Sequence, residues 1–101
     1  MVTINVLNHI EGCYSNNDGY VILNLIKNAF KDGKKVTVSF EGVNDVTSSF
    51  INSAFIELLN WYDFNHIRSN LHFTNSTKQI NSTIKHRFQF ETTQKKDVIM
   101  A

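Results

Sequence analysis

The apolar residues of this 101-residue chain switch repeatedly between strand-like and helix-like spacing. Three short stretches place apolar side chains at every second position, as strands do: Val2–Leu7, Val36–Phe40 and Leu71–Thr74. After each of them comes a stretch with apolar residues three and four apart, which is typical of amphipathic helices. This alternation predicts an α/β domain with parallel neighbouring strands and right-handed crossovers. With a short additional strand at Gly12–Ser15, we expect a mixed, mostly parallel sheet of about four strands covered by helices.

The first helix has recognisable ends. Asn17 or Asp18 is expected to cap it, because a short side-chain oxygen accepts hydrogen bonds from first-turn N–H groups. Asp32-Gly33 is expected to end it, since glycine readily adopts the left-handed conformation of a helix stop. The apolar positions that should face the core are Ile22, Leu25, Ile26, Ala29 and Phe30.

The C-terminal part of the chain predicts a loop, a strand and a third helix. Residues 62–69 are expected to form the loop, and Asn75 or Ser76 should cap the helix. Its apolar line is Ile80, Ile84 and Phe88, and Lys85, His86 and Arg87 are expected near its C-terminal end. We expect the domain to span residues 1–91 and residues 92–101 to form an irregular tail.

The stretch Asn44–Asp63 predicts one long helix that begins at three consecutive hydroxyl residues. At about 100° per residue, one half of this helix is apolar. It carries Phe50, Ile51, Ala54, Phe55, Leu58, Leu59, Trp61 and Tyr62. The opposite half carries Ser49, Asn52, Ser53, Ile56, Asn60 and Asp63. Ile56 is therefore expected to be an apolar side chain on an otherwise polar, outward-facing surface.

Composition excludes several classes of protein. The net charge of +1 leaves no broad basic surface for nucleic acid or an anionic membrane. No stretch approaches the roughly 20 apolar residues of a membrane span, and the N-terminus lacks the features of a signal peptide. The one cysteine, Cys13, excludes an internal disulfide. We expect a cytoplasmic protein; the oligomeric state cannot be read from the sequence.

The segment GKKVTVSFEGVNDVTSSFINSAFIELL resembles the prokaryotic STAS-like domains of unknown function. That family has a basic Gly-Lys turn, an apolar strand ending in Phe, a Gly-Val turn and a Thr-Ser-Ser-Phe helix start. The resemblance extends over roughly residues 10–90 and implies a small STAS-like α/β fold. The Phe-Glu-Gly-Val and Thr-Ser-Ser-Phe-Ile-Asn pieces are its specific part.

The wider STAS group includes anti-sigma-factor antagonists, which carry a phosphorylated serine at this helix start. The resemblance places Ser48 at that position and Ser49 beside it. Two residues depart from the Asp-Ser-Ser/Thr-Gly pattern of those proteins, because Thr47 replaces the Asp and Phe50 replaces the Gly. Many relatives also carry Asp where this chain has Ser39. The resemblance thus implies the fold more directly than a phosphorylation switch.

The Thr47-Ser48-Ser49 cluster has two interpretations. The simple one is helix capping, and the second is phosphorylation of Ser48 or Ser49, with Thr47 as a further candidate. A phosphate at a helix N-terminus is tolerated by the fold, so its effect would fall on a docked partner. We expect the partner to bind the face that carries Ser49, Asn52, Ser53, Ile56 and Asn60.

Other candidate sites have weaker patterns. Cys13 and His9 could suggest Cys–His catalysis, but no third orienting group is evident. The four histidines lack zinc-ligand spacing, and the glycines form no phosphate-binding motif. The sequence therefore predicts no catalytic site, no metal and no cofactor.

The function that follows is a non-enzymatic regulatory module that binds a partner protein. The resemblance to anti-sigma-factor antagonists implies an ATPase partner of the histidine-kinase-like type, and serine phosphorylation is an additional hypothesis. The alternative is a small-molecule or nucleotide sensor that binds an anion at the N-terminus of the same helix.

Overall fold

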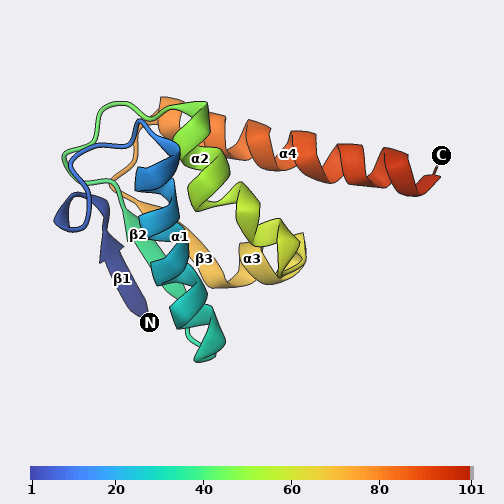
Figure 1. The fold of residues 1–101 in the computed structure, drawn as a ribbon, viewed down its shortest axis with the longest axis horizontal. Coiled ribbons are helices and arrows are strands. Elements are labelled where there is room, and N and C mark those ends of the chain that lie inside the picture. The colour runs from blue at the N-terminus through green and yellow to red at the C-terminus, as the bar shows by residue number, and fades with distance from the viewer. Residues whose placement is uncertain (101) are drawn as a thin grey trace.

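The structure, a computed structural model, describes residues 1–100, with side chains as far as residue 93. Strands and helices alternate along the chain as the sequence predicts (Figure 1). The elements are β1 (Val2–Asn5), the 3₁₀ helix η1 (Val6–Asn8), α1 (Asn16–Lys31), β2 (Val36–Ser39), α2 (Ser48–Ala54), the 3₁₀ helix η2 (Ile56–Asn60), α3 (Phe64–Asn70), β3 (Leu71–Thr74) and α4 (Lys78–Met100).

Within the described residues the sheet has three strands in the order β1-β2-β3, and both pairs are parallel. The expectation of about four strands in a mixed sheet is therefore wrong. The segment expected to be the additional strand, Gly12–Ser15, is a loop. The Cys13 carbonyl in this loop accepts a hydrogen bond from Thr47 N at 3.0 Å, so the segment pairs with the start of α2 rather than with a strand.

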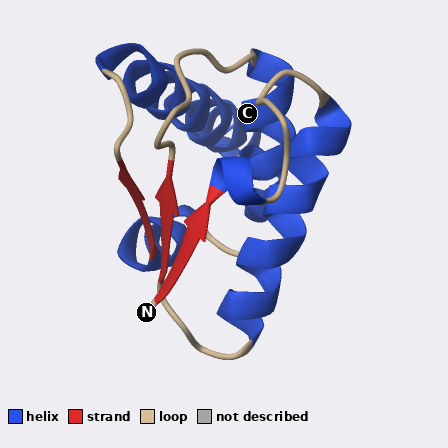
Figure 2. Ribbon diagram, turned by 90° about the vertical axis from the view of Figure 1, so that its left-hand side faces the viewer, coloured by secondary structure: helices blue, strands red, loops and turns tan. Residues whose placement is uncertain are grey.

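The strand register separates an apolar face of the sheet from a polar one. Ile4, Val38 and Phe73 lie side by side in one row, and the helices cover this face. Right-handed crossovers place α1 and α2 on the same side of the sheet, which Figure 2 shows as one layer of strands beside the helices. The opposite face carries Thr3 and His72, both exposed.

Helix α1 begins two residues earlier than a cap at Asn17 would place it. Its N-cap is Ser15, whose Oγ accepts a hydrogen bond from Asp18 N at 3.1 Å, so neither Asn17 nor Asp18 is the cap. The predicted end is confirmed: Asp32 is the C-cap and Gly33 has a φ of 74°. The predicted core positions are buried, apart from Leu25, which is half-buried.

The long helix expected over Asn44–Asp63 is not continuous. Helix α2 ends at Ala54, Phe55 leaves the helical conformation with a φ of −122°, and η2 follows. A 3₁₀ helix turns about 120° per residue instead of 100°, so the expected apolar face loses its alignment after Phe55. Trp61, expected in the core, is 52% exposed instead, with Lys27 Nζ 3.6 Å from the centroid of its ring.

The expected loop over residues 62–69 is largely helix. Asp63 caps α3, because its Oδ1 accepts a hydrogen bond from His66 N at 2.7 Å. Ile67 is the only residue of α3 that is buried, which explains why its seven residues show no helical pattern. Tyr62, expected in the core, is half-buried and stacks on His66 with ring centroids 4.9 Å apart.

Helix α4 begins at Lys78 and packs on α2 and η2. Neither Asn75 nor Ser76 caps it; Thr77 Oγ1 accepts the hydrogen bond of Ile80 N at 3.1 Å. The predicted line of Ile80, Ile84 and Phe88 is buried, as expected.

The backbone of α4 is helical as far as Met100 and extends beyond the rest of the molecule (Figure 1). The segment expected to be an irregular tail is thus helical over residues 92–100, and Ala101 lies outside the described residues. Lys85, His86 and Arg87 are consequently in the middle of a helix, not near its C-terminal end.

Candidate functional site

Thr47 caps α2 and also attaches a distant loop to it. Its Oγ1 accepts a hydrogen bond from Phe50 N at 3.2 Å and donates one to the carbonyl of Tyr14 at 2.9 Å. The backbone N–H of Thr47 donates to the Cys13 carbonyl at 3.0 Å. The capping interpretation of the hydroxyl cluster is thereby confirmed for Thr47, whose hydroxyl is used both as donor and as acceptor.

Ser48 and Ser49 form the first turn of α2, and both are exposed. Their hydroxyls do not provide the cap, because Thr47 does. The two serines are therefore accessible to another protein, whereas modification of Thr47 would break the hydrogen bonds that start the helix.

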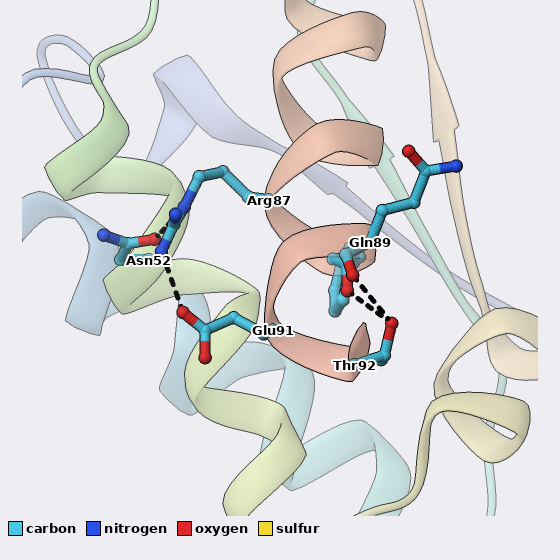
Figure 3. Close-up of polar contacts among 6 residues, drawn as sticks. Asn52, Arg87, Gln89, Glu91 and Thr92 are labelled. Atoms are coloured by element: carbon cyan, nitrogen blue, oxygen red, sulfur yellow. Dashed lines mark hydrogen bonds and ion pairs between the residues drawn. The ribbon is translucent and has the colours of Figure 1, made fainter. Parts of the chain in front are cut away.

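Asn52 follows one turn later and connects α2 to α4. Its Oδ1 accepts a hydrogen bond from Arg87 Nε at 2.8 Å, and Arg87 Nη2 pairs with Glu91 Oε1 at 3.1 Å. Figure 3 shows the Arg87 guanidinium between these two oxygens. The guanidinium is partly exposed, with 27% of the side-chain surface accessible, so this polar network lies at the surface.

Ile56, at the start of η2, is half-buried and packs against the hydrophobic core. It also lines a groove of about 270 Å³ between the α2–η2 segment and α4. The other lining residues are Asn52, Glu57, Leu59, Asn60, Arg87 and Glu91. An apolar residue thus has amides and charged groups of both signs around it.

Ser53, expected on the exposed face, is buried with 3% of its surface accessible. Its hydroxyl donates to Asn16 Oδ1 at 2.9 Å, at the contact between α1 and α2. The two helices approach closely at Gly19, where a Cβ would lie 2.6 Å from Ser53 Cβ. Helix α1 therefore covers Ser53. Ser53 therefore does not belong to the accessible surface, although Ser49, Asn52, Ile56 and Asn60 do.

This surface also includes Arg87, Glu91 and Glu57, which the sequence patterns do not indicate. Arg87 was expected only to complement the helix dipole, and α4 was expected to end near it. Helical spacing could have indicated them. Arg87 and Glu91 are four residues apart, as ion pairs on one side of a helix are. Each also lies three residues after a buried position of α4, Ile84 or Phe88.

Cys13 and His9 do not form a catalytic pair in this arrangement. Cys13 is fully buried, whereas His9 is exposed. Burial, with a smaller contribution from the negative charge of Asp18, raises the pKa of the Cys13 thiol to about 12. The thiol is therefore protonated at neutral pH and unsuited to nucleophilic attack.

Two further findings concern the described part of the chain only. No three of its His, Cys, Asp or Glu side chains are grouped so that they could hold a metal ion. No helix in it combines the length and apolar character needed to cross a membrane.

Comparison with known proteins identifies the family. No curated protein and no solved structure matches the chain significantly. The profile of one family, described as a STAS-like domain of unknown function (DUF4325), matches residues 18–81. The match runs from the first turn of α1 into α4, so it includes the parallel strands β2 and β3 and the α2–η2 segment. The chain belongs to this family of STAS-like domains.

Proposed function

We propose that this chain is a non-enzymatic regulatory module that binds another protein through the exposed side of α2 and η2. The observation that carries this proposal is the position of Ile56, which lines a groove of about 270 Å³ between η2 and α4. Protein interfaces commonly combine an apolar centre with a polar rim, and Asn52, Asn60 and Arg87 provide such a rim here.

The proposed class of partner rests on the resemblance to anti-sigma-factor antagonists alone. The resemblance to anti-sigma-factor antagonists favours an ATPase of the histidine-kinase-like type. Ser49 and Asn52 are one turn apart in α2 and Asn60 ends η2, so the binding surface would extend along both elements. Arg87 and Glu91 enlarge this surface onto α4.

Phosphorylation of Ser48 or Ser49 is the proposed regulation of this contact. Both hydroxyls are exposed, whereas the Thr47 hydroxyl holds the helix start. A phosphate would add about −1.5 to −2 charges beside the binding face and repel a partner fitted to the neutral serines. Mass spectrometry after incubation with ATP and the kinase-like partner should find phosphate on Ser48 or Ser49. Its absence from both residues would end the phosphorylation part of the proposal.

The alternative of an anion or nucleotide sensor has less physical support. Helix α2 has seven residues, and Phe50 N already donates to Thr47 Oγ1. A thermal-shift screen with nucleotides separates the two functions, because a ligand that binds the native state raises the melting temperature. We expect no shift. A large shift in the absence of any protein would favour the sensor.

The direct test of the binding function is co-purification of the chain from the cells that produce it. We expect one protein with an ATP-binding domain to be recovered in a defined ratio and to bind the purified chain again. Failure of every recovered protein to bind the purified chain would contradict the proposal.

A further inference from the structure

A second surface lies at the start of α1, where the loop after η1 meets the helix. It is hollowed, with a volume of about 630 Å³. It shares no lining residue with the groove that contains Ile56, so the two are separate surfaces. Its lining consists of His9, Ile10, Glu11, Gly12, Tyr14, Asp18 and Val21.

The apolar part of the hollow is open to solvent. Tyr14 is 61% exposed and Val21 is 41% exposed, and Ile10 is nearly buried beside them. Exposed apolar side chains that are grouped in a concave site, rather than scattered, are typical of binding surfaces. A ligand that covers these side chains would therefore gain free energy by removing them from water.

The charged part of the hollow is acidic. Glu11 and Asp18 both line it, and no lysine or arginine belongs to its described lining. Asp18 and Val21 are three residues apart in α1 and therefore lie on the same side of the helix. A carboxylate and an apolar side chain thus stand next to each other along one wall.

We propose that this hollow binds a basic segment of a partner protein, in which an arginine or lysine is adjacent to an apolar residue. The cation would pair with Asp18 and Glu11, and its aliphatic stem would pack on Tyr14 and Val21. An aromatic face can also attract the cation directly. The proposal concerns a different surface from that of Ile56, so either proposal can fail without the other.

A peptide titration of the full ¹⁵N-labelled chain, followed by NMR, tests this inference. The probe is the blocked peptide acetyl-Gly-Leu-Arg-Leu-Gly-amide, and the control peptide carries Glu in place of Arg. We expect the Arg peptide to shift the amide signals of Gly12, Tyr14, Asp18 and Val21 in a saturable way. The Glu peptide should leave them unchanged, because the hollow contains two carboxylates.

Matched variants locate the interaction. The double substitution Glu11→Gln and Asp18→Asn should weaken binding of the Arg peptide by about tenfold or more, since it removes both charged partners of the cation. Asp45→Asn removes a charge from an exposed loop residue outside the hollow and should leave the affinity unchanged. A circular-dichroism spectrum of each variant confirms that the fold is retained.

Several results would overturn the inference. These are equal binding of the Arg and Glu peptides, equal weakening by Asp45→Asn, or shifts confined to residues outside the hollow. Absence of any shift at millimolar Arg peptide would also overturn it. Free arginine is the last control, because equal affinity for the amino acid would show that the apolar wall contributes nothing and would exclude a peptide site.

Discussion

Gly19 of α1 lies so close to Ser53 of α2 that a Cβ at position 19 would stand 2.6 Å from the Cβ of Ser53. The same Cβ would lie 2.7 Å from the carbonyl oxygen of Phe50, which is a backbone atom and cannot rotate away. The Ser53 hydroxyl also donates to Oδ1 of Asn16, which precedes Gly19 by three residues in α1, at 2.9 Å. The absence of a side chain at Gly19 thus sets the distance between the two helices and buries Ser53.

Gly19→Ala should therefore destabilise the protein, although alanine is the better helix former. Overpacking of this kind costs about 1–3 kcal/mol, whereas alanine in place of glycine contributes about 1 kcal/mol to an exposed helix. Asn24→Ala, at an exposed position of the same helix, is the matched control and should change stability by less than about 0.5 kcal/mol. Urea denaturation measures both. A Gly19→Ala variant as stable as the parent would show that the helices can separate at little cost.

Thr47→Val should destabilise α2 and release the loop that contains Cys13 and Tyr14. Valine has the shape of threonine but cannot accept from Phe50 N or donate to the Tyr14 carbonyl. Loss of such a cap costs about 0.5–2 kcal/mol. Thr47→Ser keeps the hydroxyl and should recover most of this loss. Equal denaturation midpoints for the Val and Ser variants would contradict the capping role.

Much of the fold follows from local patterns in the sequence. β3 has the predicted bounds, β2 stops one residue short of its prediction, and β1 ends at Asn5, where η1 takes over. These predictions succeed because alternating apolar residues and a glycine stop are local signals. The line of Ile80, Ile84 and Phe88 is equally local, since a buried helix side needs an apolar residue every turn.

The remaining features depend on contacts between distant segments. Ser53 is polar and lies where the helical pattern expects solvent, but the absence of a side chain at Gly19 brings α1 over it. The change from α2 to η2 at Phe55 has no local signal in the sequence, and Trp61, which follows η2, is exposed as a result of the altered turn angle. The candidate site likewise depends on contacts between distant segments, because Arg87 reaches Asn52 only once α4 has packed against α2.

Cys13 should react slowly with iodoacetamide in the native protein. It is fully buried, and burial raises its pKa from 9.0 to about 12, so little reactive thiolate is present at neutral pH. Unfolding with guanidinium chloride should restore an ordinary rate, and mass spectrometry of the alkylated chain gives both rates. Equal rates in the native and unfolded states would contradict this burial.

The same pKa shift predicts a decrease in stability at alkaline pH. Between pH 9.0 and about 12 the unfolded chain releases the thiol proton and the native chain retains it, so the thiolate favours unfolding as the pH rises. Below pH 9.0 this effect is absent. The free energy of unfolding of Cys13→Ala, measured by urea denaturation, should therefore fall less between pH 9.0 and about 12 than that of the parent; an equal fall in both would contradict the shift.

The affinity of the Ile56→Asp variant for the co-purified partner tests the central claim most directly. Tyr20→Asp is the matched control, because it also places a carboxylate at an accessible site but lies outside the groove of Ile56. Circular dichroism first confirms that both variants are folded. We then expect Ile56→Asp to weaken partner binding by about tenfold or more and Tyr20→Asp to leave it unchanged. Unchanged affinity of a folded Ile56→Asp variant would contradict the assignment of this face as the binding surface.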